Sequence, residues 1–134
     1  MIALVTGASS GIGAATAERF AADGHSLVLW SRRRDRLKAV ARRCRELGSP
    51  SVEIVPLDVR DRTAVRAEMA ENPNRYGGID ILVNNAGLAR GMAPFQESRA
   101  EDFDEMIDTN VKGFLNVTQA ILPGMLARNR GHLV

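Results

Sequence analysis

Glycines near the start of the chain are spaced as in turns that bind phosphate groups. They stand at positions 7, 11 and 13. Gly7 allows a sharp turn, Gly11 lets the backbone approach a diphosphate, and Gly13 lets the following helix pack close to the preceding strand. The N-terminus of that helix offers free amides and a partial positive charge to an anion. The pattern predicts a dinucleotide-binding turn, and a turn with only a structural role is the alternative.

A cluster of arginines stands where a nucleotide-binding strand would end. Ser31, Arg32 and Arg33 occupy the place where NAD-binding proteins usually put an acidic residue for the ribose hydroxyls. Arginine suits a 2′-phosphate because its planar fork binds phosphate oxygens in pairs and stays charged at any working pH. The residues therefore predict NADP as the cofactor, bound through Arg32 and Arg33. The alternative is that these side chains, with Arg34 and Arg36, form only the solvated start of a helix.

Strand-like and helical segments alternate along the chain and would position these residues. Short apolar runs without polar alternation are typical of strands buried on both faces of a parallel sheet. They occupy residues 2–6, 26–30, 52–57 and 81–84. Helical periodicity predicts helices between them, at residues 12–22, 34–47 and 62–71.

The last third of the sequence predicts one long helix and a short strand. Ser98 and Glu101 have the spacing of a capping box, so a helix is expected to begin near Arg99 and to run past Asn110 toward residue 128. Residues 131–134 look like the start of a fifth strand. This order predicts an α/β fold, a Rossmann-type doubly wound parallel sheet that is truncated at the start of its fifth strand.

Composition and charge limit the class of protein. Apolar residues make up 45% and charged residues 25% of the chain, as in soluble globular proteins. No apolar run approaches the roughly 18 residues of a membrane span, so we expect a cytoplasmic protein without a membrane partner. The net charge of +2 gives little reason to expect a nucleic-acid partner. Cys44 is the sole cysteine and is interpreted as a packing residue, and we expect no metal site.

Four motifs together resemble the short-chain dehydrogenase/reductase family over the entire chain. They are the glycine-rich turn at residues 6–13, Leu57-Asp58-Val59, Asn84-Asn85-Ala86-Gly87, and Asn110. The resemblance implies an NADP-dependent oxidoreductase that transfers hydride between NADP(H) and a hydroxyl or carbonyl substrate. Residues 80–89, 106–110 and 122–125 are most similar to the 3-hydroxy acid dehydrogenases of that family. That similarity implies a small 3-hydroxy acid, such as serine, as the substrate.

The resemblance also assigns roles in cofactor binding by position. Asp58 would bond the adenine amino group, Val59 would pack beside the ring, and the segment after the fourth strand would line the ribose. Asp58 could instead merely cap the next turn, and Asn84 and Asn85 could instead satisfy backbone groups at the sheet end. The full set of candidate cofactor-binding residues is Gly7, Ser9, Ser10, Gly11, Ile12, Gly13, Arg32, Arg33, Asp58, Val59, Asn85, Ala86 and Gly87.

The residues that catalyse the family's reaction are only partly present. The resemblance makes Asn110 the asparagine of the catalytic tetrad, which helps to hold a water of the proton relay, although it could be a helix irregularity without a role. The family also uses a serine and a Tyr-x-x-x-Lys pair, whose lysine lowers the tyrosine pKa for proton exchange near neutral pH. Tyr76 is the only tyrosine, and Asp80 stands four positions after it.

We therefore expect residues 1–134 to form the incomplete NADP-binding domain of a longer enzyme, catalytically inactive by itself. A catalytically silent NADP-binding sensor or regulator is the alternative. The long helix has more apolar surface than one sheet face can cover, and the family pairs this helix between subunits, which implies a dimer or tetramer of the full-length protein. The apolar residues concerned are Phe103, Met106, Phe114, Leu115, Ile121 and Leu122.

Overall fold

A five-stranded parallel sheet forms the centre of the computed structural model, which describes residues 1–91 and 93–134. The strand order is β3-β2-β1-β4-β5. The strands are β1 (Ile2–Thr6), β2 (Ser26–Ser31), β3 (Val52–Pro56), β4 (Ile81–Val83) and β5 (His132–Leu133). The helices are α1 (Gly11–Ala22), α2 (Arg34–Glu46), α3 (Arg62–Glu71), α4 (Pro73–Tyr76), a 3₁₀ turn η1 (Phe95–Glu97), α5 (Ala100–Ile107), a π-helical segment η2 (Asp108–Gly113) and α6 (Phe114–Ala127).

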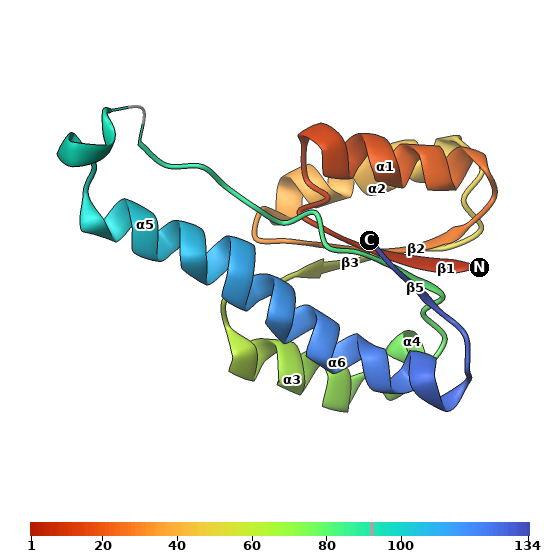
Figure 1. Ribbon diagram of the computed structural model, residues 1–134. Coiled ribbons are helices and arrows are strands. Elements are labelled where there is room, and N and C mark those ends of the chain that lie inside the picture. Colours follow the sequence, from red (N-terminus) through yellow and green to blue (C-terminus); the bar gives the residue numbers. More distant parts are fainter. Residues whose placement is uncertain (92) are drawn as a thin grey trace.

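Helices cover both faces of this sheet. Figure 1 shows α1 and α2 on one face and α3 with α6 on the other. Successive residues of a strand point to opposite faces, so Leu4 packs on the α3–α6 side while Ala3 and Val5 pack on the α1–α2 side. Cys44 lies on the latter side with its thiol fully buried, and burial raises its pKa to about 11. The predicted packing role of Cys44 agrees with this position.

The predicted strands are present: the first four differ from their predicted bounds by one residue at three carboxyl ends, and the fifth is one residue shorter at each end. The expectation of burial on both faces holds for β1 and β2 but is wrong for β3. Glu53 and Pro56 of β3 are exposed, because this strand lies at the edge of the sheet and pairs only with β2. Residues 132–133 pair with β4 as the predicted fifth strand. The fold is therefore the predicted Rossmann-type α/β sheet.

The long helix differs from its prediction in two ways. The predicted capping box is wrong, because the Ser98 hydroxyl donates to the carbonyl of Pro94 at 3.3 Å and caps no helix. Arg99 is the N-cap of α5 and makes no side-chain capping bond. In addition, the π-helical segment η2 interrupts the α-helix around Asn110, and π-segments of this kind are frequent at functional sites. The helical axis nevertheless continues through η2 into α6 (Figure 1).

Most of the apolar side chains that the sequence assigns to an uncovered helix face are partly covered. Ile121 is buried in the core, and Phe103 stacks on Phe95 with ring centroids 5.3 Å apart. Phe114 and Leu115 remain 45% and 53% exposed. Val111 and Ile107 lie one and two turns before Leu115 on the same stripe and are about equally exposed. Among the described residues, no helix is both long enough and apolar enough to cross a membrane.

Candidate functional site

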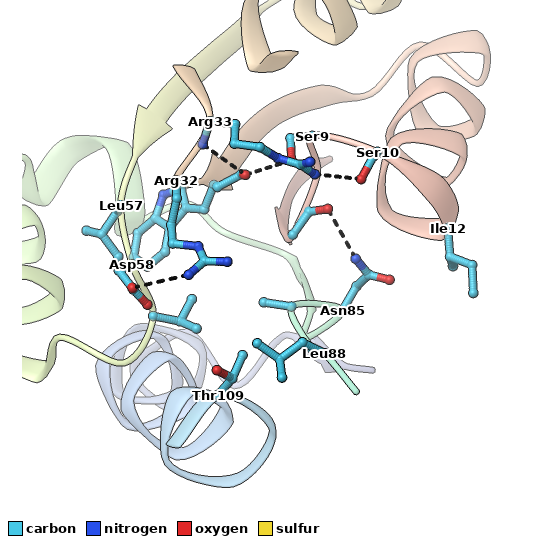
Figure 2. Close-up of a pocket in the computed structure, with 16 residues that line it drawn as sticks. Ser9, Ser10, Ile12, Arg32, Arg33, Leu57, Asp58, Asn85, Leu88 and Thr109 are labelled. Carbon is cyan, nitrogen blue, oxygen red and sulfur yellow. Dashed lines mark hydrogen bonds and ion pairs between the residues drawn. The ribbon is translucent and has the colours of Figure 1, made fainter. Parts of the chain in front are cut away.

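A pocket of about 500 Å³ opens at the carboxyl ends of β1, β2, β3 and β4. In open α/β sheets, ligands bind at this edge, where the strand order reverses direction. Here the reversal lies between β1 and β4. The lining residues are Gly7, Ser9, Ser10, Ile12, Trp30, Ser31, Arg32, Arg33, Leu57, Asp58, Val59, Asn85, Ala86, Gly87, Leu88 and Thr109. Figure 2 shows these side chains around the pocket.

The glycine-rich turn forms one wall of the pocket. Gly7 and Gly11 have φ values of 65° and 57°, in the left-handed region that favours glycine. A Cβ atom on Gly13 would lie 2.6 Å from the carbonyl oxygen of Gly7, so only glycine allows this approach of helix and turn. Ser10 is the N-cap of α1, and its side chain makes no capping bond. The amides of the first turn of α1 therefore lack intrahelical partners and are suited to an anion.

Hydrogen bonds tie this turn to the segment after β4. The Thr6 hydroxyl, which is buried, accepts from the amide of Ala86 at 2.9 Å and lies 3.3 Å from the carbonyl of Val83. The Asn85 side chain donates to the carbonyl of Thr6 at 3.0 Å. Asn85 thus satisfies backbone groups at the sheet end, as one interpretation of the sequence expected, and it also lines the pocket. Asn84 lies outside the pocket lining and donates to the hydroxyl of Thr118.

Arg33 reaches across the pocket from the end of β2 to the glycine-rich turn. Its Nη2 atom donates to the hydroxyls of Ser9 and Ser10, at 2.9 and 2.8 Å. The Ser31 hydroxyl donates to Ser9 at 2.8 Å. Serine hydroxyls are neutral acceptors, and a phosphate is a stronger partner for a guanidinium. Arg33 therefore holds a cationic group at the mouth of the turn, ready for an anion.

Arg32 faces Asp58 on the other side of the same pocket. The Nη1 atom of Arg32 lies 3.9 Å from Oδ2 of Asp58, and the Arg32 side chain is 55% exposed. Asp58 also accepts from the amide of Arg60 at 3.0 Å, so it caps the next turn as one interpretation of the sequence expected. Arg34 and Arg36 are exposed and lie outside the pocket lining, in agreement with the interpretation of these two as a solvated helix start.

Asn110 stands in the π-helical segment η2, next to the lining residue Thr109, but is not itself a lining residue. Its amide oxygen accepts from the amide of Leu88 at 2.9 Å, and its amide nitrogen donates to the carbonyl of Leu88 at 2.8 Å. Asn110 thereby fixes the segment that follows Gly87. Gly11 and Gly13 also lie outside the lining, whereas the other eleven candidate cofactor-binding residues belong to it.

Three lining residues were not singled out by the sequence analysis. Trp30 is fully buried and looks like an ordinary strand residue, and Leu88 and Thr109 carry no motif of their own. Only Thr109 could have been found from the sequence, through its position directly before Asn110. Tyr76 packs edge-on against Trp30 in the core and donates to Glu68 at 2.6 Å. Tyr76 is not among the lining residues, in keeping with the sequence-based exclusion of this tyrosine from catalysis.

The pocket residues fit a phosphorylated dinucleotide. The volume of the pocket falls within the roughly 300 to 1,000 Å³ of small-molecule sites, and the pocket walls carry two arginines and uncapped helix amides. The Thr109 hydroxyl is buried and has no hydrogen-bond partner among the described residues. A buried polar atom without a partner beside a pocket suggests a group that a ligand would satisfy. The described part of the chain contains no cluster of His, Cys, Asp or Glu that could hold a metal ion.

Comparison with known proteins gives matches over the whole chain. The family model for short chain dehydrogenases matches residues 1–134. The NADP-dependent 3-hydroxy acid dehydrogenase YdfG of Salmonella typhi is 48% identical over 134 residues, which are 100% of this chain and 52% of that protein. The chain thus spans about half the length of the relatives that it matches.

Solved structures of serine dehydrogenase share the fold. The crystal structure of the Escherichia coli enzyme is 47% identical, with a TM-score of 0.89 over 99% of this chain and 60% of that chain. A closed form of serine dehydrogenase complexed with NADP⁺ has the same identity and TM-score, over 99% of this chain and 52% of that chain.

Proposed function

The chain belongs to the short-chain dehydrogenase family, and on that premise we propose that it supplies the cofactor site of an NADP-dependent oxidoreductase. The reaction is hydride transfer between NADP(H) and a hydroxyl or carbonyl substrate, and the substrate is a small 3-hydroxy acid. The 134 residues act as the NADP-binding domain of that enzyme. The NADP-dependent 3-hydroxy acid dehydrogenase named above supports this substrate class.

One observation carries the proposal. Two arginines from the end of β2 line the same pocket as the glycine-rich turn, and no acidic residue stands at position 31, where the ribose hydroxyls of NAD would need one. We assign the 2′-phosphate to Arg32 and Arg33. Gly7 and the start of α1 would hold the diphosphate, and Asp58 and Val59 would hold the adenine.

The pocket residues also have a proposed part in the chemistry. NADP(H) supplies or accepts the hydride when it is bound. Asn85, Ala86 and Gly87 line the ribose, and Asn110 holds this segment in place through Leu88. Both polar atoms of the Asn110 side chain are bonded to Leu88. We therefore assign the proposed water of the proton relay to the backbone carbonyl of Asn110.

Turnover by the protein expressed from its complete reading frame tests the function. We expect serine and other 3-hydroxy acids to reduce NADP. The near-ultraviolet absorbance of the NADPH that forms measures this reaction. A polypeptide limited to residues 1–134 should bind NADPH without turnover, because its sequence contains no Tyr-x-x-x-Lys pair. NADPH binding without turnover in the complete protein as well would contradict the enzyme and favour the alternative, a sensor or regulator.

We also propose that the complete protein is a homo-oligomer, a dimer or tetramer, paired through the exposed stripe that runs from the end of α5 through η2 into α6. Ile107, Val111, Phe114 and Leu115 form this stripe. In a two-fold interface Leu115 is buried twice, at about 1.5–3 kcal/mol for each copy. Leu115→Glu should therefore weaken dimerisation by at least about a hundredfold, since about 1.4 kcal/mol corresponds to a factor of ten. Sedimentation velocity over a range of concentrations measures this change.

The control is an apolar side chain outside the stripe. Phe95 is 80% exposed and lies in η1, so Phe95→Glu should leave the association state unchanged. Monomeric unmodified protein at micromolar concentration would contradict the proposed oligomer. An equal loss of association in both variants would remove the stripe as its interface.

A further inference from the structure

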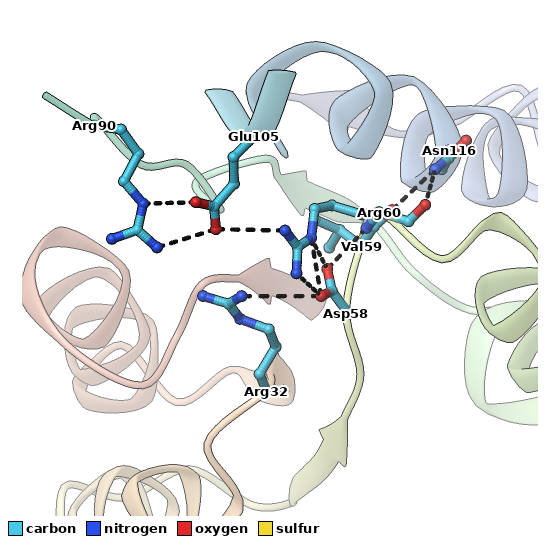
Figure 3. A network of polar contacts seen from close by, with 7 residues as sticks. All are labelled: Arg32, Asp58, Val59, Arg60, Arg90, Glu105 and Asn116. Carbon is cyan, nitrogen blue, oxygen red and sulfur yellow. Dashed lines mark hydrogen bonds and ion pairs between the residues drawn. The ribbon is translucent and has the colours of Figure 1, made fainter. Parts of the chain in front are cut away.

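Arg60 makes more hydrogen bonds to the carboxylate of Asp58 than any other described residue does. The Nε atom of Arg60 lies 3.1 and 3.0 Å from the two carboxylate oxygens, and its Nη2 atom lies 2.7 Å from Oδ2. The backbone amide of Arg60 adds a fourth bond, at 3.0 Å. Figure 3 shows this fork-to-carboxylate contact. Such paired contacts between a guanidinium and a carboxylate are short and geometrically specific.

A second layer of contacts fixes Arg60 itself. Its Nη1 atom lies 3.4 Å from Glu105 of α5, and Arg90 donates to the same carboxylate at 2.7 and 3.0 Å. The Asn116 side chain donates to the backbone carbonyl of Arg60 at 3.4 Å and to that of Val59 at 3.0 Å. Arg60 is thus held at both its side chain and its backbone, by residues from α5 and α6 (Figure 3).

Arg32 lies next to the same carboxylate but is not hydrogen-bonded to it. Its nearest approach, 3.9 Å to Oδ2 of Asp58, exceeds hydrogen-bond length, and its side chain is more exposed than that of Arg60, at 55% against 33%. Burial alone would raise the pKa of Asp58, but the hydrogen bonds and charge of Arg60, together with the charge of Arg32, outweigh burial and lower it. Asp58 therefore stays ionised, with Arg60 as its hydrogen-bonded partner.

We propose that Arg60 is a positioning residue for cofactor selection: by holding Asp58, it leaves Arg32 available for the 2′-phosphate of NADP. Without Arg60, the Asp58 carboxylate would draw Arg32 into a direct ion pair and would repel a phosphate in the same pocket. Arg60 does not line the pocket itself, so it acts through its two neighbours. The inference rests on the proposed function, in which Arg32 contacts that phosphate.

Nucleotide fragments test this role without any catalytic step. We would titrate 2′,5′-ADP and 5′-ADP into the protein expressed from its complete reading frame, at low ionic strength. The ratio of the two affinities reports recognition of the 2′-phosphate. We expect Arg60→Leu to lower that ratio by about tenfold, because one charge interaction near the surface is worth about one decade in affinity. Arg60→Gln keeps a polar side chain and serves as a second variant in case the leucine variant does not fold. It should lower the affinity ratio as well.

A double substitution separates this role from a merely structural one. If Arg60 acts by neutralising Asp58, then Asp58→Asn combined with Arg60→Leu should restore most of the lost ratio, because no carboxylate remains to capture Arg32. Arg42→Leu is the matched control, since Arg42 is exposed on α2 and lies 4.0 Å from its partner Glu46. Arg42→Leu should leave the ratio unchanged.

The outcomes distinguish the two proposals. An unchanged ratio in Arg60→Leu, or a loss that Asp58→Asn does not reverse, would overturn the role of Arg60 while leaving NADP binding intact. A lack of preference for 2′,5′-ADP in the unmodified protein would overturn the cofactor proposal and, with it, the role of Arg60.

Discussion

Gly13→Ala should sharply weaken binding of NADPH and should also destabilise the fold. The new methyl group would lie 2.6 Å from the carbonyl oxygen of Gly7 and would also collide with the side chain of Asn85. Both neighbours line the pocket, so the clash must displace the turn that is proposed to bind the diphosphate. Overpacking of this kind costs about 1–3 kcal/mol. We expect a similar loss in unfolding free energy, and a loss in NADPH affinity of about fivefold to a hundredfold, since about 1.4 kcal/mol corresponds to a factor of ten.

A destabilised variant with an intact pocket is the control for Gly13→Ala. Gly24 has a φ of 76° and open space around it, far from the pocket lining. Gly24→Ala should therefore lower the unfolding free energy, by about 1 kcal/mol, through backbone strain alone. Its NADPH affinity should be unchanged. Chemical denaturation and calorimetric titration of both variants give the two quantities, and unimpaired NADPH binding by Gly13→Ala would remove the turn from the site.

Arg32→Ala should remove most of the preference for NADPH over NADH. A charge-assisted hydrogen bond to the 2′-phosphate contributes about 1.5–3 kcal/mol, which corresponds to about a tenfold to hundredfold change in affinity. The affinity for NADH, which lacks this phosphate, should change little. High salt should reduce the preference of the unmodified protein, because the Arg32 side chain is more than half exposed. Titration of each cofactor into the Arg32→Ala variant at two salt concentrations measures both effects.

Ser31→Asp tests the same preference from the opposite direction. A carboxylate at this position should accept from the ribose hydroxyls of NADH and repel a 2′-phosphate, so NADH binding should improve while NADPH binding weakens. The Ser31 hydroxyl bonds to Ser9, and the Arg33 guanidinium bonds to Ser9 and Ser10, so the substitution also places a negative charge beside this network. An NADPH/NADH ratio that neither substitution alters would return the arginines to the interpretation of a solvated helix start.

The sheet and its main helices could be predicted because their signals are local. Apolar runs and helical periodicity need no knowledge of distant residues, and the resulting bounds of α3 and β1 agree with the structure. The prediction of a capping box was wrong because the Ser98 hydroxyl donates to the nearby carbonyl of Pro94 instead. The edge position of β3 also depends on strand order, which apolar runs alone do not reveal.

The candidate site was predictable only where motifs carry it. The glycine-rich turn and the arginines are each a short stretch of sequence that follows a predicted strand. They meet at one pocket because β1 and β2 are parallel neighbours in the sheet. The bonds that tie Asp58 to Arg60 and Arg60 to Glu105 could not be foreseen. Arg60 and Glu105 lie 45 residues apart in the sequence and meet only because α5 lies beside the loop that joins β3 to α3. The contacts of Asn110 with Leu88 depend in the same way on the π-helical segment.

The most direct test of the account compares NADPH with NADH in the unmodified protein. The central claim is that the glycine-rich turn and the two arginines that follow β2 form one site that selects the 2′-phosphate. Calorimetric titration of both cofactors, under identical conditions and at low salt, should give an affinity for NADPH that is about tenfold to hundredfold higher. Equal affinities for the two cofactors, or binding of neither, would contradict that claim.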